Sequence, residues 1–415
     1  MKKSVLAALI FYMAVSAQQS PLGSRYPFGI PDLAVTGSAA ALGGGGAAVA
    51  EEQMGICLNP ANAAIGSRAA FSAMVSFDLT NISGDGGSSW IHGYSPQLMS
   101  LIIPFGRAGN AAFSMQQQYN ANLNFGPDTT IDGYKTDIIT LHRTGGVTAW
   151  QAGWAYRFRS GFGVGILYEH LFFNSDSRDI FVTRFSDERM INQMTIGENT
   201  VTSLSAGGIR LGMQIPVHER VMLGVAAAGI FHGKDNGTEM FMRSYRDNTY
   251  ASTQFSWDVQ EESVFSSSLP SSFNIGAAYK PDDRWLFAAD AYMTLWGLWD
   301  DADTHFDSRD LRSTTLGISA GARFIPAANL LSSTYVEKIH YSTGLRYTSL
   351  PGTSAHEYAL YLGTGLPIAN DGGLIDVVLS FGQRIDTQLS KYSENIFKIQ
   401  LGINGGRSWF HRGDI

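Results

Sequence analysis

Residues 150–159, WQAGWAYRFR, alternate between an apolar series and a small or polar series. In an extended strand, one face would carry Trp150, Ala152, Trp154, Tyr156 and Phe158, and the other Gln151, Gly153, Ala155, Arg157 and Arg159. Because successive side chains of a strand point to opposite faces, this period of two predicts a β-strand with one apolar and one polar face. A barrel wall between lipid and a wet lumen needs such faces, although a soluble β-sandwich has the same period.

Fourteen stretches with this period follow one another after residue 68, and most are near the ~9–11 residues of a tilted transmembrane strand. They lie at 69–79, 98–105, 110–119, 147–158, 162–172, 202–215, 221–232, 270–279, 285–295, 313–324, 338–347, 356–367, 373–383 and 396–403. The main short connections lie at 106–109, 159–161, 216–220, 280–284 and 368–372, and the long ones at 80–97, 120–146, 173–201, 233–269 and 296–312. Since an even number of strands can close without an unpaired edge, we predict an all-β fold, a 14-stranded antiparallel transmembrane β-barrel.

The N-terminus has the three parts of a secretion signal: the charged pair Lys2-Lys3, the apolar run Val5–Ala14 and the small residues Val15-Ser16-Ala17. We therefore assign residues 1–17 to a signal peptide. No later run reaches the ~20 apolar residues of a transmembrane helix. With the strand pattern, this predicts the bacterial outer membrane, with both termini in the periplasm and the long loops outside.

Composition agrees with a membrane barrel. Only 16% of the residues are charged, which is low against the ~25% of soluble domains. The net charge of −7 argues against nucleic acid, which needs a basic surface. The lone cysteine, Cys57, fits an exported protein without disulfides, and we interpret it as a small buried residue.

Residues 18–68 contain no convincing strand and are rich in glycine and alanine before the motif Asn59-Pro60-Ala61. Residues this small can fold compactly in a narrow space. We predict an N-terminal hatch inside the lumen over 18–68, the barrel over 69–403 and a periplasmic tail over 404–415. The run Gly43–Gly46 does not predict a phosphate-binding loop, because no Gly-Lys-Ser/Thr sequence follows it.

The polar faces of the predicted strands carry charged residues. They include Arg157, Glu169, Arg210, Asp290, Arg323, His340, Arg346, Asp376, Arg384 and Lys398. Because a Lys or Arg on the lipid face at mid-membrane costs ~2–4 kcal/mol, we expect these side chains to face the lumen or an interface. Pairing across the interior is the main interpretation, and direct contact between Arg157, Arg210, Arg323 or Arg346 and a ligand is the alternative.

Two predicted outer loops are rich in large apolar residues. The candidates for ligand capture are Phe181, Phe185, Met190 and Met194 in one loop and Met240, Phe241, Met242, Phe255 and Trp257 in the other. Exposed apolar clusters often mark binding surfaces, and methionine adapts to irregular ligands. The alternative is that these residues pack the loops on one another as a lid, and the two interpretations are compatible.

Three features resemble the FadL/TodX (OmpP1) family of outer-membrane long-chain fatty acid and hydrocarbon transporters. They are the Gly-Ala segment Gly37–Ala47 followed by Asn59-Pro60-Ala61, the stretch Leu269–Phe273 followed by Trp285, Asp290 and Trp296, and the count of fourteen strands. The C-terminal sequence Trp409–Arg412 departs from the best-known members. With Gly363–Pro367 and Ile375-Asp376, it looks like a Bacteroidetes-like branch.

The resemblance implies passive uptake of hydrophobic small molecules, such as long-chain fatty acids, by a monomer. The ligand would be captured by outer loops and released laterally through the wall into outer-membrane lipid, with the hatch blocking the straight path. A fatty chain gains ~0.8 kcal/mol per buried CH₂, so release into lipid is far easier than release into water. The wider group also includes secretion-system shuttles, so a protein-binding barrel with a surface or secreted protein partner stays open as the alternative.

Other functions have weaker support in the sequence. Gly317-Ile318-Ser319-Ala320-Gly321 matches the nucleophile-elbow pattern, but it lies within a predicted strand and not at a strand-to-helix turn. The acidic stretch 296–312 could bind calcium, but its spacing fits no EF-hand. The spacing of His and Cys predicts no zinc site. We predict no enzyme and no cofactor, and the hatch argues against an open diffusion porin.

Overall fold

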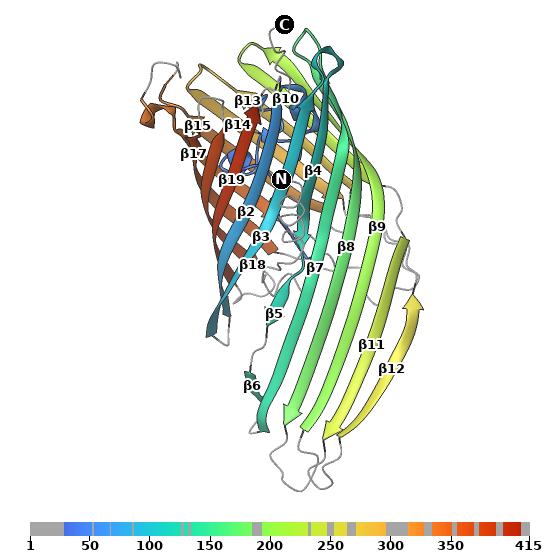
Figure 1. The fold of residues 1–415 in the computed structure, drawn as a ribbon. Coiled ribbons are helices and arrows are strands. Elements are labelled where there is room, and N and C mark those ends of the chain that lie inside the picture. The colour runs from blue at the N-terminus through green and yellow to red at the C-terminus, as the bar shows by residue number, and fades with distance from the viewer. Residues whose placement is uncertain are drawn as a thin grey trace.

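The computed structural model describes residues 29–51, 54–66, 68–84, 87–125, 128–131, 134–184, 193–230, 234–246, 253–263, 271–295, 314–327, 334–350, 355–368, 373–386 and 393–407. Fourteen strands form a closed antiparallel barrel (Figure 1). They are β2 (Ala69–Gly84), β3 (Gly87–Pro104), β4 (Asn110–Asn120), β7 (Tyr134–Arg157), β8 (Gly163–Arg184), β9 (Gln193–His218), β10 (Val221–Ile230), β13 (Ser271–Tyr279), β14 (Trp285–Leu295), β15 (Thr314–Phe324), β16 (His340–Ser349), β17 (Ala355–Pro367), β18 (Leu374–Asp386) and β19 (Ser393–Arg407). The predicted fold class is therefore confirmed.

The ring closes between the last strand and the first. β19 pairs with β2 from Ser393↔Ser83 to Arg407↔Ala69, and each other strand pairs with its neighbour in the ring. Closure satisfies main-chain hydrogen bonds within the wall, which lipid cannot do. No helix among the described residues is long and apolar enough to span a membrane.

The two faces of the wall are as the alternation predicts. Trp150, Trp154 and Tyr156 are exposed on the outer face, whereas Gln151 and Ala155 are buried on the inner face. The inward face also buries charged side chains, including Glu169, Asp290, Arg323, Asp376 and Arg384. Apolar side chains outside and charges inside fit lipid around the ring and polar contacts within it.

This arrangement predicts a depth-dependent cost for a charge on the outer face. Leu345 near the middle of β16 is 60% exposed, and Val217 at the end of β9 is 61% exposed. We expect Leu345→Arg to destabilise the barrel by about 2–4 kcal/mol and Val217→Arg by about 0–1 kcal/mol, because only the first charge lies at mid-membrane. Urea unfolding in phospholipid vesicles measures both. Equal costs would contradict the assignment of this face to lipid.

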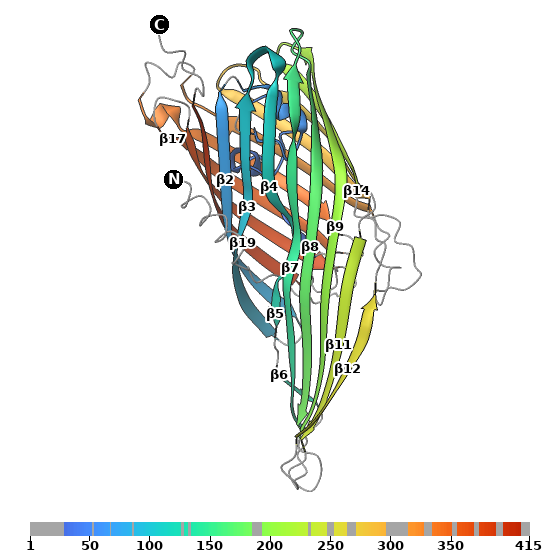
Figure 2. The same ribbon diagram turned by 45° about the vertical axis from the view of Figure 1, so that its right-hand side comes forward.

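Several predicted loops are in fact strands. β7, β8 and β9 contain 24, 22 and 26 residues, and the stretch 233–269 contains the hairpin of β11 (Lys234–Arg246) and β12 (Thr253–Ser263). These strands continue well beyond the rest of the ring (Figures 1 and 2). Over the residues that the structure describes, the predictions of loops at 80–97, 173–201 and 233–269 were therefore wrong. Their polar residues lack the membrane signal, but pairing between neighbouring strands continues through them.

The loop predicted at 120–146 is also largely strand, since β7 begins at Tyr134 and two short strands precede it, β5 (Leu123–Phe125) and β6 (Asp128–Ile131). At the chain's end, β19 continues to Arg407, past the predicted limit at residue 403. The predicted signal peptide, the acidic stretch 296–312 and Trp409–Arg412 lie outside the described residues.

The N-terminal segment, residues 29–66, is nearly devoid of regular structure. Its described residues, 29–51 and 54–66, contain only three elements of regular structure: β1 (Ile30–Pro31), the short helix α2 (Gly37–Ala40) and the 3₁₀ turn η3 (Pro60–Ala64). Most of its residues are buried. Its polar contacts reach inward-facing side chains on opposite sides of the ring, among them Asn110 of β4, Gln214 of β9, Asp290 of β14 and Asp376 of β18.

Candidate functional site

The wall has a seam between β3 and β4, where the ladder between them stops. The two strands pair from Pro104↔Asn110 only as far as Leu98↔Gln116, although β3 continues beside β2 to Gly87. Register shifts lie at this level in both neighbouring ladders, one between Met74 and Val75 and one between Gln117 and Tyr119. Such bulges bend a strand and end pairing, and Pro96 cannot donate a ladder hydrogen bond.

The N-terminal segment supplies the missing partner of β4. β1 pairs with its free edge through Ile30↔Asn120 and Pro31↔Tyr119, and the Asp32 N–H donates to the Gln118 carbonyl at 2.8 Å. This approach needs Gly29, whose φ is +84° and whose missing Cβ would lie 2.0 Å from the Asn120 oxygen. Residues 30–32, which are not part of the ring of strands, thus complete the main-chain hydrogen bonding of β4.

Asp32 ties the same segment to the other side of the seam. Its carboxylate accepts hydrogen bonds from Gln97 Nε2 at 2.7 Å and Ser95 Oγ at 3.3 Å, both on β3. Its Oδ1 also lies 3.7 Å from Lys398 Nζ on β19. Because the side chain of Asp32 is only 3% exposed, these contacts offset the cost of removing its charge from water. The seam is therefore closed by main-chain hydrogen bonds to β4 and side-chain hydrogen bonds to β3, both from one short segment.

A cavity of about 190 Å³ lies inside the ring beside this seam. Pro31, Asp32, Gln116, Gln118 and Tyr119 line it on the seam side. Its apolar lining comes mainly from Leu33, Leu58, Val147 and Leu171. The volume is below the ~300–1,000 Å³ of drug-sized ligand sites, so the cavity fits a small hydrophobic molecule or one segment of a chain.

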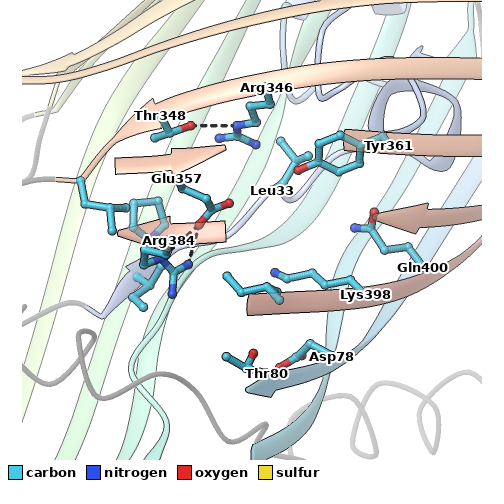
Figure 3. A pocket seen from close by; sticks show the side chains of 14 residues that line it. Leu33, Asp78, Thr80, Arg346, Thr348, Glu357, Tyr361, Arg384, Lys398 and Gln400 are labelled. Atoms are coloured by element: carbon cyan, nitrogen blue, oxygen red, sulfur yellow. Dashed lines mark hydrogen bonds and ion pairs between the residues drawn. The ribbon is translucent and has the colours of Figure 1, made fainter. Parts of the chain in front are cut away.

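A second, polar pocket lies against β16–β19 and β2 (Figure 3). Arg384 holds it together, donating to Glu357 at 2.5 Å and to Glu394 at 2.6 Å. The volume is about 40 Å³, which is room for a few water molecules at most. We therefore interpret this pocket as a charge network that stabilises the wall, and the 190 Å³ cavity as the space for a ligand.

Arg346 lines both spaces and differs from the other lumen cations. Its guanidinium donates to Tyr292 Oη at 2.7 Å and Thr348 Oγ1 at 3.1 Å, and it lies 5.1 Å from the Tyr292 ring centre. Its hydrogen bonds within the described part of the chain thus go to neutral hydroxyls. A polar group of a ligand in the cavity would meet this guanidinium.

The other predicted lumen arginines occupy different environments. Arg210 pairs with Glu169 at 3.2 Å on the cavity wall, and Arg323 pairs with Glu51 of the N-terminal segment at 2.5 Å. Arg157 is half-buried at the end of β7 and is not among the residues that line either space. The structure therefore brings Arg210 and Arg346 to one cavity and leaves Arg157 and Arg323 apart from it.

The motif Asn59-Pro60-Ala61 anchors the N-terminal segment to the wall. Asn59 Nδ2 donates to the carbonyls of Ala47 at 2.8 Å and Met213 at 2.9 Å, and its Oδ1 accepts from the Ala61 N–H at 3.0 Å. Asn59 is thus the N-cap of η3, with Pro60 as the first residue of the turn, where its fixed φ is favourable. Nearby, burial raises the pKa of the Cys57 thiol to about 12, so this cysteine stays protonated.

The predicted capture residues are only partly described. Phe185 and Met190 lie outside the described residues. Phe181 lies in β8 opposite Ile196, and Met194 lies opposite Tyr245. Met240, Phe241 and Met242 lie in β11, and Met242 is opposite Trp257 of β12, the strand that also contains Phe255. These positions lie in β8, β9, β11 and β12, in the sheet that continues the wall beyond the rest of the ring.

Sequence reasoning missed Asp32, Gln97 and Tyr292 as parts of the site. Asp32 and Gln97 act through neighbours far along the chain, so no local pattern marks them. Pro96, inside a stretch that we interpreted as loop, was the one available sign of an interrupted ladder. Ser319 lies in β15 as predicted, and the described residues contain no group of three or more metal-ligating side chains.

Solved structures with the same fold include two toluene transporters and a FadL homologue. The Pseudomonas putida toluene transporter TodX matches with a TM-score of 0.60 and 13% identity, over 92% of this chain and 100% of that one. A Pseudomonas aeruginosa FadL homologue matches with a TM-score of 0.62 and 11% identity, over 92% and 100%. The Ralstonia pickettii toluene transporter TbuX matches with a TM-score of 0.55 and 13% identity, over 91% and 98%.

At these identities the likeness establishes the fold, which is that of the FadL/TodX-type barrels. Among curated proteins, no sequence matches this chain. The model of one protein family, described as BamG, matches residues 1–415, which is the whole chain. The chain therefore belongs to the BamG family.

Proposed function

We propose that this protein is an outer-membrane channel for the passive uptake of hydrophobic small molecules, such as long-chain fatty acids, with lateral release through the seam between β3 and β4. The observation that carries the proposal is the position of the partly apolar cavity directly beside that seam. The solved relatives with this fold include toluene transporters. Short turns at one end of the ring support periplasmic termini.

In this proposal the N-terminal segment is the gate. β1 and Asp32 close the seam, and the Asn59-Pro60-Ala61 anchor holds the segment across the straight path. A ligand that enters the cavity competes with Leu33 and Pro31 for the apolar lining, which favours displacement of β1 from β4. Release into lipid avoids the ~0.8 kcal/mol per CH₂ that exposure to water would cost.

A disulfide between β1 and β4 tests this route. Pro31 and Tyr119 are directly opposite in antiparallel register, a geometry within the ~4.4–6.8 Å Cα separation that a disulfide accepts. We expect the variant Pro31→Cys/Tyr119→Cys, in a Cys57→Ser background, to lose oleate uptake when oxidised and to regain it with dithiothreitol. The assay uses radiolabelled oleate in cells lacking their own fatty acid channel, with a hydrophilic sugar as the leakage control.

The matched control is Thr343→Cys/Leu362→Cys, which joins the paired strands β16 and β17 far from the seam. It should take up oleate in both redox states. Uptake by the oxidised seam variant at the reduced rate would exclude release past β1. No oleate uptake by any correctly inserted barrel would argue against the transport function itself.

The sheet that β7, β8, β9, β11 and β12 form beyond the ring (Figure 2) favours a second function, which is the binding of a surface or secreted protein. β9 has 26 residues and is about 86 Å long at roughly 3.3 Å per residue, more than twice the ~9–11 residues that a membrane crossing needs. With β7, β8, β11 and β12 it offers a broad surface beyond the ring (Figure 2). The capture role of the apolar residues in these strands and the Bacteroidetes-like branch both stay predictions.

A further inference from the structure

The outer face of the wall is hollowed by an apolar groove of about 460 Å³ across β7–β10. Two rows of outward residues border it, each in direct cross-strand register. One row is Trp154–Ile166–Leu211–Ala227, and the other is Tyr156–Val164–Met213–Val225. The volume falls within the ~300–1,000 Å³ range of ligand sites, whereas most of a barrel's outer surface is convex.

The floor of the groove is main chain. The row between the two borders is Ala155–Gly165–Gly212–Ala226, in which all side chains are small or absent. On the inner side the Asn59-Pro60 motif fills the space, since a Cβ on Gly212 would lie 2.1 Å from Asn59 Oδ1 and one on Gly165 would lie 2.5 Å from the Pro60 carbonyl carbon. Gly165 and Gly212 therefore admit this motif on the inner side. The hollow on the outer side arises because the outward residues Val164, Val225 and Ala227 are short beside Trp154, Ile166 and Leu211.

The position of the groove decides what can occupy it. Its large side chains are exposed, with Ile166 at 50% and Leu211 at 51%, on a face that lipid surrounds. Trp154 Nε1 donates to the Ala108 carbonyl at 2.8 Å, in the short turn between β3 and β4. That bond holds the indole at the end of the wall where the interfacial aromatic residues of a barrel lie. The groove thus opens into the leaflet that is nearer to the short turns.

We propose that this groove is a binding site for one acyl chain of a phospholipid from that leaflet. In lipid there is no hydrophobic gain between apolar partners, so occupancy depends on van der Waals fit. A rigid partner surface would leave voids between the two rows of outward side chains, and each void forfeits contacts. A flexible acyl chain fills the hollow and packs against Trp154, Ile166 and Leu211. The site does not depend on the transport function.

Lipid retention tests the proposal. Native mass spectrometry of the detergent-solubilised barrel, after mixing with 1-palmitoyl-2-oleoyl phosphatidylethanolamine, should show one phospholipid that survives delipidation. Ala227→Trp fills the groove from its exposed edge and should lose that lipid. Ala289→Trp, an equally outward position on β14, should keep it. Equal retention by wild type and a folded Ala227→Trp would overturn the proposal.

A second measurement follows the lipid at the groove of the wild-type protein. Fluorescence is recorded in vesicles that contain increasing fractions of phospholipid brominated on the acyl chain. The contribution of Trp154 is the fluorescence of wild type minus that of Trp154→Phe at each fraction. We expect its quenching to reach half-maximum at about fivefold less brominated lipid than that of Trp285, obtained in the same way with Trp285→Phe. The same midpoint for both would mean that ordinary annular lipid covers the groove, and would overturn the proposal.

Discussion

Replacing Arg384 with methionine is expected to destabilise the folded barrel by about 3–5 kcal/mol, the cost of leaving buried carboxylates without their cation. Arg384 bridges Glu357 of β17 and Glu394 of β19, and Glu394 is completely buried. Methionine keeps much of the side-chain volume, so the change removes mainly the charge. Urea unfolding in vesicles, followed by loss of the heat-modifiable gel mobility of the folded barrel, measures the effect.

Lys280→Met is the control, because Lys280 pairs with Asp283 at 3.8 Å on the surface, where both side chains are exposed. An exposed pair contributes about 0–1 kcal/mol, so this variant should unfold close to wild type. Similar midpoints for the two variants would show that the network around Arg384 contributes no more than a surface pair. The polar pocket would then have to be reconsidered as a ligand site.

Replacing Asn59 with alanine is expected to release the N-terminal segment from the wall while the barrel stays folded. The change removes an N-cap, typically worth about 1 kcal/mol. It also leaves the part-buried carbonyl of Met213 without this donor, at about 1–3 kcal/mol, whereas the Ala47 carbonyl keeps a longer hydrogen bond from Gln214 Nε2 at 3.4 Å. If the segment is the gate, single-channel conductance of the purified protein should rise and uptake of the hydrophilic sugar should appear. Pro60→Ala should have the same direction and a smaller effect, since it removes no hydrogen bond.

Asn395→Ala provides the matched comparison, because Asn395 is exposed on β19 and accepts from Gln383 at 3.3 Å within the wall. Its conductance should equal that of wild type. If Asn59→Ala and Pro60→Ala both fold and conduct as wild type does, the motif is a structural anchor only. The gating part of the proposed function would then be withdrawn.

The strand pattern predicted the wall well, for a local reason. The fourteen stretches found from alternation correspond one to one with the strands of the ring, and 285–295 coincides with β14. The face of the wall on which a side chain lies was also predictable, because it depends on the residue's own chemistry. Trp150 and Ile166 lie on the lipid side, and Glu169 and Asp376 lie on the interior side. The strand ends away from the short turns were not predictable, because beyond the membrane both faces of a strand can be polar.

The candidate site was predictable only in part. Asn59-Pro60 stood out by its motif, and Arg210 and Arg346 by their place on the polar face. Nothing near Asp32 in the sequence indicates that it would meet Gln97, Ser95 and Lys398, which lie 63 to 366 residues away. Such contacts depend on where the N-terminal segment lies in the ring, and local patterns carry no information about that.

The sequence by itself therefore determined the class of the protein, the number of its strands and the side of the wall that meets lipid, because each follows from the period of apolar residues along the chain. Only the tertiary structure decided where the wall is interrupted, which segment closes it and where a cavity and an outer groove remain. These features arise where ladders stop or where short outward side chains of neighbouring strands meet. They depend on register between strands, and register is set by the closed ring as a whole.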